Sequence, residues 1–502
     1  MRSFVFSLAF VLFASPALHA QKSVDDSKAI ALFDSYIQQS MPNWKVPGLS
    51  IVVVKNGNVV FRKAYGVREL GNPEPYTTST LSTCASTTKA MTAVCMGMLV
   101  DEGKVKWSDR VSDLLPGFKL SDPYSSAEIT VHDLFTHNSG LGNADNLWVF
   151  GYSRNEIIKR MKEIPPAYSF RSSYIYQNLM YIVAGEVIHK ISGKTWDEFI
   201  TERLFKPIGM NHSFADHSLI PAGDNTTTPH FKDRARGDSV RAISYYHGDN
   251  IGAAGGVWSC ADDMDKWLQC LLDSTRIHET RLLKPETFTT IFQPKIVIPG
   301  LMYPTMQLLK PHWQTYGLGW FQHDYRGRMV QFHTGSLDGL VAITGLMPDE
   351  KSGVYVFGNL DHAELRHALL YKAFDLWNFH DNNNDWSNDF LNLYKGLQDT
   401  AIKKENELLA KRVLHTKPSL PLAAYTGKYT NTLAGEAEVV LTNDMLTVKL
   451  PNHISLTLDH WHYDVFYGTW SYWWFDKSWI QFSLNKEGKV TSLSIDGEVY
   501  VR

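Results

Sequence analysis

The chain has 502 residues, of which 44% are hydrophobic and 20% are charged. This length is sufficient for a large buried core and for more than one domain. Its 49 basic and 52 acidic side chains give a formal net charge of −3. Because no overall positive field attracts nucleic acid or an acidic membrane surface, we expect neither of them as a partner.

The first 20 residues have the pattern of a secretory signal peptide. Arg2 precedes an apolar run over residues 4–14, and Pro16 and Ala20 follow it. The run is shorter than a membrane-spanning helix requires, and no later segment is long and apolar enough to be a span. We therefore expect residues 1–20 to be removed and the mature chain to be exported, to the periplasm or the medium.

The four cysteines do not form a pattern that predicts a metal site. Cys84 and Cys95 flank most of a predicted helix, which places them about 15 Å apart and beyond disulfide reach. Cys260 and Cys270 have a similar spacing. We expect buried free thiols, and no metal or other cofactor.

The N-terminal elements are predicted from periodicity and turn residues. Residues 26–41 have the pattern of an amphipathic helix. The apolar run at 49–54 leads into an Asn-Gly pair at 56–57, which is typical of a hairpin turn. The segment 86–102 is apolar nearly all round and is followed by Gly103, which predicts a buried helix with a glycine stop.

Helices and then strands are predicted in the middle of the chain. Residues 105–190 are expected to be mostly helical, and a further helix is expected over 262–272. Alternating segments predict strands of one sheet at 317–321, 329–334, 341–347 and 354–359.

A change in composition marks a domain boundary near residue 385. A run of asparagines at 382–384 precedes a charged helix predicted over about 389–414, and Pro418 and Pro421 lie in a short linker. Closely spaced strand patterns beyond Tyr425 predict a small antiparallel β-domain. The expected organisation is a large domain at 21–385, a helical linker at 386–420 and a β-domain at 421–502.

Ser86 and Lys89 form the first candidate catalytic pair. In Ser86-Thr87-Thr88-Lys89 they lie on one face of a helical turn. A serine hydroxyl is a poor nucleophile unless a neighbouring base removes its proton, and a desolvated lysine can act as that base. The same spacing also occurs by chance on solvated turns. Because residues 90–94 are mostly apolar, an unpartnered ammonium group would be costly here, which favours a catalytic pair.

Tyr176 and Asn178 form a second candidate pair. They are two residues apart, so in an extended loop both side chains face the same side. A phenol near Lys89 can pass a proton to a leaving group, and the amide can orient the lysine or a substrate amide. A tyrosine-rich core segment is the alternative, since Tyr174 and Tyr181 lie close by.

The third candidate is His333-Thr334-Gly335-Ser336, which follows the strand pattern at 329–332. Glycine on a strand lets a substrate approach the backbone closely, and the next N–H group can complete an oxyanion hole. The alternative is a strand that simply ends in a turn.

Together these motifs resemble those of the serine β-lactamase and penicillin-binding protein superfamily, whose signature is S-x-x-K, S-D-N and K-T-G. The Tyr-x-Asn form of the second motif is similar to that of class C β-lactamases, D-alanyl-D-alanine peptidases and carboxylesterases. The resemblance covers about residues 28–378. Further matching features occur in order at Val46-Pro47-Gly48, Leu134-Phe135-Thr136-His137-Asn138-Ser139-Gly140-Leu141, Gly255-Gly256 and Asp263-Met264.

The resemblance implies an α/β (α+β) fold of the β-lactamase/transpeptidase type. Its antiparallel sheet is flanked by helices beside an all-helical lobe, and the site lies in the cleft between them. The C-terminal part resembles the small antiparallel β-domains, some of them lipocalin-like, that are appended to members of this branch. Such a domain would cover the cleft or bind elsewhere, and we expect Trp470, Trp473 and Trp474 in its core rather than on a ligand platform.

The resemblance also implies roles for the motif residues. Ser86 would attack a carbonyl and form an acyl-enzyme. Lys89 and Tyr176 would share general-base and general-acid duty, and Asn178 would orient Lys89 and the substrate amide. The backbone N–H groups of Ser86 and Ser336 would form the oxyanion hole.

His333 departs from the pattern, because lactamases and D-alanyl peptidases usually carry lysine there. His333, Thr334 and Gly335 would line the substrate on the sheet side. Lysine holds a permanent charge that attracts a substrate carboxylate, whereas histidine is largely neutral at pH 7. The substitution His333→Lys would therefore raise reactivity toward penicillins.

We expect a serine hydrolase that cleaves an ester or a small peptide amide, including one with D-residues, and that has weak or no β-lactamase activity. The partner would be a small-molecule or short-peptide substrate. Two alternatives remain on the same fold. One is a penicillin-binding or sensor protein with little turnover, and the other is a true class C-type β-lactamase.

Overall fold

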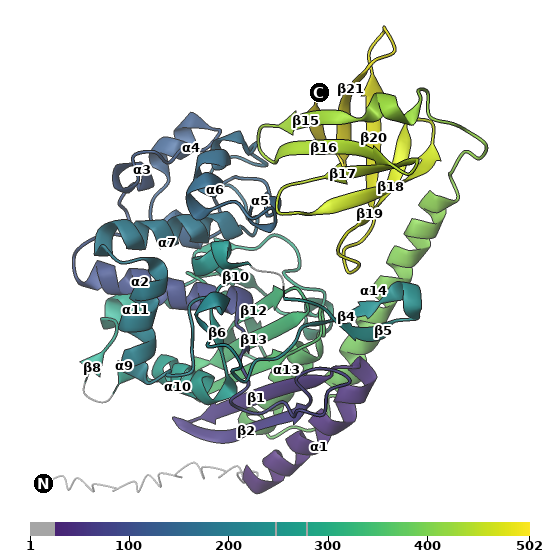
Figure 1. Ribbon diagram of the computed structural model, residues 1–502. Coiled ribbons are helices and arrows are strands. Elements are labelled where there is room, and N and C mark those ends of the chain that lie inside the picture. The colour runs from purple at the N-terminus through teal and green to yellow at the C-terminus, as the bar shows by residue number, and fades with distance from the viewer. Residues whose placement is uncertain (1–25, 246–247, 278–279) are drawn as a thin grey trace, which may run out of the picture.

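The computed structural model describes residues 26–245, 248–277 and 280–502 (Figure 1). The signal peptide expected at residues 1–20 lies outside the described residues. Within these ranges no helix has both the length and the apolar character that a membrane span requires. Figure 1 shows a sheet with its covering helices, a helical lobe beside it and a C-terminal barrel.

The central sheet has eight antiparallel strands in the order β2-β1-β14-β13-β12-β11-β10-β9. Strand β14 returns to pair with β1, which lies next to the edge strand β2. Their bounds are β1 Gly48–Lys55, β2 Asn58–Gly66, β9 Ile296–Val297, β10 Gln314–Tyr316, β11 Phe321–Tyr325, β12 Arg328–Leu337, β13 Leu340–Met347 and β14 Ser352–Gly358.

Both faces of the sheet are buried, as the residues of β1 show. Ile51 and Val53 pack into one core with α1 (Asp26–Trp44) and α13 (Leu365–Asn378), whereas the alternate residues of the strand belong to the core shared with the helical lobe. Helix α10 (Ala261–Leu272) covers the second face over β1 and β14. A strand buried on both sides explains why residues 51–54 are all apolar instead of alternating with polar residues.

The helical lobe follows β3 (Ser82–Thr83) and holds short helices around the buried α2 and α7. Its elements are η1 Ala85–Thr87, α2 Thr88–Asp101, α3 Val111–Leu114, α4 Pro123–Glu128, η2 His132–Phe135, α5 Asn146–Val149, α6 Arg154–Arg160, η3 Met161–Glu163, α7 Asn178–Ser192, α8 Trp196–Ile200, η4 Thr201–Phe205 and α9 Lys206–Ile208. Residues 105–190 contain helices and no named strand, but loops make up about half of this stretch, which we expected to be mostly helical.

Short elements connect the lobe to the sheet or join later strands of the sheet to one another. They are η5 His217–Leu219, β4 His230–Asp233, η6 Arg234–Arg236, β5 Ser239–Ala242, η7 Asp249–Ala254, β6 Trp258–Ser259, β7 Arg276–Ile277, β8 Thr280–Arg281, α11 Pro285–Phe292, α12 Met306–Leu309 and η8 Pro348–Glu350. Strands β4 and β5 form a separate hairpin, and β6 pairs with β3 just before the first motif.

The C-terminal domain is a closed antiparallel barrel of eight strands. Helix α14 (Trp386–Leu409) and η9 (Leu422–Tyr425) precede it. Its core contains apolar residues from all around the barrel and also Phe150 from the helical lobe. Its strands are β15 Gly427–Asn431, β16 Gly435–Thr442, β17 Met445–Lys449, β18 Ser455–His462, β19 Val465–Trp470, β20 Ser478–Leu484, β21 Val490–Ile495 and β22 Glu498–Val501.

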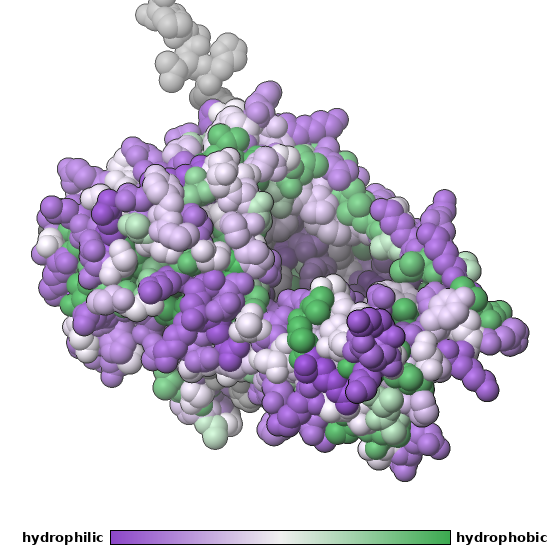
Figure 2. All heavy atoms as spheres, turned by 90° about the horizontal axis from the view of Figure 1, so that it is seen from above, coloured by the Kyte–Doolittle hydropathy of each residue, from purple (hydrophilic) through white to green (hydrophobic). Residues whose placement is uncertain are grey.

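The barrel also reaches the β4–β5 hairpin through the loop after β19. The Arg241 guanidinium lies over the Trp473 ring, 4.3 Å from its centroid, and Trp474 lies against β4. Trp470 packs against the barrel core as expected, whereas Trp473 and Trp474 lie at this contact between domains. Figure 2 shows that the face seen from above is deeply hollowed.

Three local predictions need correction. Residues 317–320 form the turn between β10 and β11 rather than a strand. Gly319 has a φ of 85°, and its backbone packs so closely against α2 that an added Cβ would lie 2.9 Å from the Lys89 carbonyl oxygen. The third motif lies inside β12 rather than after it. Asn178 is the first residue of α7, capped by Gln177, and is not part of an extended loop. The four cysteines are free and buried, as predicted.

Candidate active site

A tight turn presents Ser86 at the start of α2. Ala85 has a φ of 43°, in the left-handed region that residues with a side chain rarely adopt. The Thr83 hydroxyl accepts a hydrogen bond from the Ala85 N–H at 3.0 Å, and the Thr87 hydroxyl donates to the Cys84 carbonyl at 2.9 Å. Ser86 is partly exposed although its neighbours are buried, so its hydroxyl is accessible.

Lys89 is fully buried one turn further along and contacts Ser86 directly. Its Nζ lies 3.1 Å from Ser86 Oγ, 2.7 Å from Asn178 Oδ1 and 2.8 Å from the Ala254 carbonyl oxygen. Burial lowers the pKa of Lys89 from 10.5 to about 7, although the negative charge of Asp145 raises it in part. A neutral amine donates its two protons to Asn178 Oδ1 and the Ala254 carbonyl oxygen, and its lone pair can accept the Ser86 proton. This arrangement can activate a serine as a nucleophile.

Asp145 binds the side-chain amide of Asn178, which in turn binds Lys89. Both of its carboxylate oxygens accept hydrogen bonds from Asn178 Nδ2 at 3.1 Å, which turns Asn178 Oδ1 toward Lys89. Sequence reasoning missed Asp145. It lies 33 residues before Asn178 in a loop without a motif, so only the fold brings the two together.

The ring of Tyr176 packs against the amine of Lys89. Lys89 Nζ is 4.9 Å from the centroid of the Tyr176 ring, and the hydroxyl makes no hydrogen bond of normal geometry with a described residue. Burial raises the pKa of Tyr176 well above 10, although the nearby Ser86 side chain lowers it in part. The phenol is therefore neutral and able to donate a proton.

The backbone of β12 lies directly against the Ser86 turn. A Cβ added to Gly335 would come within 2.3 Å of the Cys84 carbonyl oxygen and 3.1 Å of the Ser86 nitrogen. The pairing of β11 with β12 ends at Phe332, so this stretch of β12 has no strand on that side. Ser336 is exposed next to it. Glycine is thus required here by the close approach of two backbones.

His333 and Thr334 of the third motif form hydrogen bonds with other groups of the protein. His333 has no exposed surface; its Nε2 is 3.0 Å from the Tyr316 hydroxyl, and its Nδ1 is 2.6 Å from the Thr334 carbonyl oxygen. Burial and the nearby Lys89 lower the pKa of His333 to about 3. The Thr334 hydroxyl lies 2.5 Å from the hydroxyl of Tyr303. His333 is therefore a neutral supporting group in this structure.

The comparison with known families matches this geometry. The beta-lactamase family matches residues 33–375, which is more than half of the chain. The chain belongs to the beta-lactamase family. A domain of unknown function, DUF3471, matches residues 411–501 and so covers the barrel. The resemblance inferred from the three motifs is confirmed.

This beta-lactamase family chain is similar to several curated proteins. It is 26% identical over 438 residues to "Unguisins hydrolase ungD" of Aspergillus violaceofuscus, covering 82% of this chain and 76% of the relative. It is 23% identical over 339 residues to "Protein flp" of Staphylococcus aureus strain COL, covering 65% of this chain and 62% of that protein.

Two solved structures share the fold. An octameric penicillin-binding protein homologue from Pyrococcus abyssi aligns with a TM-score of 0.63 at 21% identity, covering 94% of this chain and 100% of that one. SurE aligns with a TM-score of 0.57 at 18% identity, covering 95% and 98%. The predicted β-lactamase/transpeptidase-like fold with a C-terminal antiparallel barrel is confirmed.

Two buried groups support the motifs of this beta-lactamase family chain and were not singled out as functional. His137 Nδ1 accepts a hydrogen bond from the Gln177 N–H at 2.9 Å, which anchors the loop that carries Tyr176. Arg366, paired with Glu364, donates to the Gly335 carbonyl and to Ser336 Oγ, the latter at 2.9 Å. A motif spacing cannot reveal them, because each acts from another element.

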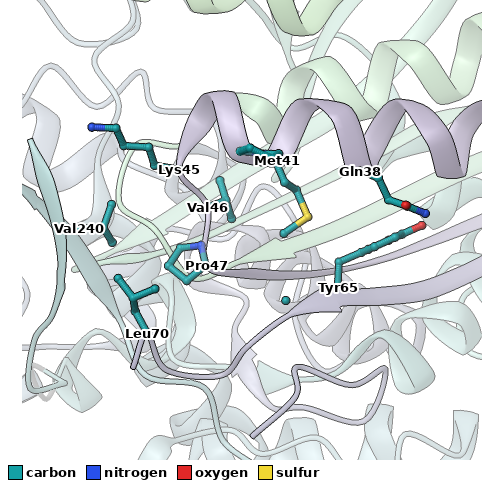
Figure 3. A pocket seen from close by; sticks show the side chains of 10 residues that line it. Gln38, Met41, Lys45, Val46, Pro47, Tyr65, Leu70 and Val240 are labelled. Atoms are coloured by element: carbon teal, nitrogen blue, oxygen red, sulfur yellow. The ribbon is translucent and has the colours of Figure 1, made fainter. Parts of the chain in front are cut away.

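A separate groove lies where the end of α1 meets β2 and β5. Met41, Lys45, Tyr65 and Val240 are among its lining residues (Figure 3). None of the motif residues lines it. Within the described ranges, no group of three or more His, Cys, Asp or Glu side chains is placed to hold a metal ion. The candidate site is therefore the Ser86 turn with its surrounding residues.

Proposed function

We propose that the chain forms an acyl-enzyme on Ser86 and cleaves an ester or a small peptide amide, with little or no β-lactamase activity. The observation that carries this proposal is the 3.1 Å contact between Ser86 Oγ and a lysine whose burial lowers its pKa to about 7. Such a lysine is partly neutral at physiological pH and acts as the base.

Each step of the proposed reaction uses one of the groups around Ser86. Neutral Lys89 takes the Ser86 proton while Oγ attacks the substrate carbonyl. The backbone N–H groups of Ser86 and Ser336 stabilise the oxyanion. The proton passes through the Tyr176 hydroxyl to the leaving group, which departs and leaves the acyl-enzyme. Water then attacks the ester, giving its proton back through the same groups and releasing Ser86.

The substrate class follows from the charge at the third motif. Neutral His333 supplies no cation for a substrate carboxylate, unlike the lysine usual in lactamases. The names of two similar proteins support hydrolysis and a D-residue. One relative is called an unguisins hydrolase, and one solved structure at 18% identity is titled as SurE with D-Leu. We also propose that the protein acts after export.

Intact-protein mass spectrometry tests the proposal. Wild type and Ser86→Ala are incubated separately with a fluorophosphonate and with a penicillin, and turnover of nitrophenyl esters and short D-residue amides is measured. We expect a fluorophosphonate adduct on the wild type alone, with ester or amide turnover. A stable penicillin adduct without turnover supports a sensor, and fast penicillin hydrolysis supports a lactamase. No Ser86-dependent adduct with either probe overturns the proposal.

A further inference from the structure

Both protein groups that accept hydrogen bonds from Lys89, apart from Ser86, depend on one segment of the helical lobe, residues 145–152. Asn178 is held by Asp145 at the start of this segment. Ala254 is the last residue of η7. Four residues earlier, before a non-helical kink at Gly252, Asn250 Nδ2 donates to the carbonyl oxygens of Trp148 and Tyr152, each at 2.9 Å. The segment therefore sets the position of both acceptors.

The opposite side of segment 145–152 is bound by the barrel. Phe150 is 8% exposed and belongs to the barrel's own apolar core. Asn146 Nδ2 donates to both carboxylate oxygens of Glu498 on β22, at 3.0 and 3.1 Å. The Tyr152 hydroxyl donates to the Ala434 carbonyl at 2.9 Å, and Asn452 Nδ2 donates to the Val149 carbonyl at 3.3 Å.

We propose that the C-terminal barrel positions the catalytic base, because its docking onto segment 145–152 holds Asp145 and Asn250 and, through them, the two acceptors of Lys89. This inference rests on the proposed role of Lys89. Phe150 and Glu498 are positioning residues in it, since neither reaches the reacting atoms. The barrel is thus part of the active site's support rather than an independent appendage.

The groups that face Lys89 make the proposal measurable by pH. His137 and His333 are buried with lowered pKa values, and burial raises the pKa values of Tyr176 and Tyr181, so these four are neutral. Asp145 supplies the charge that raises the pKa of Lys89. If segment 145–152 loses its anchor, Asp145 moves away from the lysine. The pKa of Lys89 then falls, and the neutral base persists to lower pH.

The experiment compares kcat/KM for a nitrophenyl ester against pH in full-length variants. Phe150→Ala removes the buried anchor, and the double variant Glu498→Ala/Asn452→Ala removes side-chain contacts while keeping Phe150. Arg412→Ala is the control, because Arg412 joins the barrel to the linker through the His460 and Trp461 carbonyls, away from segment 145–152. Asp145→Asn removes the charge that raises the pKa of Lys89, so it shows the direction in which the acid limb should move.

We expect both anchor variants to lose roughly tenfold in plateau kcat/KM, since small displacements of a catalytic group are costly. The acid limb of their kcat/KM profile should move to lower pH, in the same direction as in Asp145→Asn. Arg412→Ala should leave both the plateau and the acid limb unchanged. A merely structural role would lower the active fraction equally at all pH values. An unshifted acid limb in both variants overturns the inference, whereas loss of Ser86-dependent labelling in the wild type would overturn the proposed function instead.

Discussion

Gly335 lies so close to the nucleophile turn that a Cβ on it would come within 3.1 Å of the Ser86 backbone nitrogen and 2.3 Å of the Cys84 carbonyl oxygen. The substitution Gly335→Ala must therefore push β12 away from the turn. We expect kcat/KM to fall by roughly 100-fold, because the Ser86 and Ser336 N–H groups of the proposed oxyanion hole separate. The measurement is ester turnover together with thermal unfolding of the same sample.

Gly396 provides the matched control for that substitution. It lies inside α14, and an added Cβ would meet nothing within 4 Å. Gly396→Ala should stabilise the helix by about 1 kcal/mol and leave turnover unchanged. Equal losses of activity in the two variants would contradict the role given to Gly335.

The pH dependence of turnover reports on Lys89. Its pKa of about 7 means that the base is protonated and inactive below this value, so kcat/KM should rise as pH increases through about 7 and then level off. Lys89→Arg, which stays protonated, should be inactive across the range. A profile that is flat from pH 5 to 9 (roughly two units on either side of the Lys89 pKa) would argue against lysine as the base.

Two substitutions of Asn178 distinguish its role in orienting Lys89 from the effect of a charge beside Lys89. Asn178→Ala removes the 2.7 Å contact with Lys89 Nζ and should lower kcat by roughly 100-fold. Asn178→Asp places a carboxylate there instead, which favours the protonated lysine and should move the acid limb to higher pH. Both are measured as pH profiles of ester turnover. An unshifted limb in Asn178→Asp would show that residue 178 does not act on Lys89.

His333→Lys tests why β-lactamase activity should be weak. The pKa of His333, about 3, leaves this position neutral at every pH at which the enzyme would work. A lysine would restore a cation beside the cleft and should raise the rate of acylation by penicillins relative to neutral esters. The measurement is the time course of penicillin adducts by mass. His333→Gln, which adds no charge, should leave the ratio unchanged.

The buried pair of Glu364 and Arg366 predicts an acid-dependent loss of stability. Burial opposes ionisation of Glu364, but the Arg366 charge dominates and lowers the pKa of Glu364 from 4.5 to about 2. A depressed pKa contributes stability that is present above about 4.5 and is lost as pH falls toward about 2. Glu364→Gln should remove this dependence and cost about 3–5 kcal/mol at neutral pH, because Arg366 is left buried and unpaired.

Denaturant unfolding at several pH values measures this contribution. The control is Glu487→Gln, which changes the same functional group on an exposed turn. Similar unfolding free energies for Glu364→Gln and wild type at neutral pH would contradict the importance of the pair.

Sequence patterns predicted the elements whose geometry is local. The Ser86–Lys89 contact follows from a spacing of three residues on one helical turn, and the 56–57 hairpin follows from its Asn-Gly turn. The strand predicted at 317–321 is wrong for residues 317–320, because alternation does not distinguish Gly317 and Gly319 in a turn from residues of a strand. Their close approach to other parts of the backbone, which makes the segment a turn, is invisible in the sequence.

The sequence by itself determined the candidate nucleophile, its candidate base and the order of the three motifs, since each motif is a short run whose residues are neighbours in any fold. Only the tertiary structure decided what surrounds Lys89. Ala254 lies 165 residues away from it along the chain, and Asp145 acts through Asn178. The burial that lowers the pKa of Lys89 and the insertion of Phe150 into the barrel are likewise products of packing between distant segments, which no local spacing encodes.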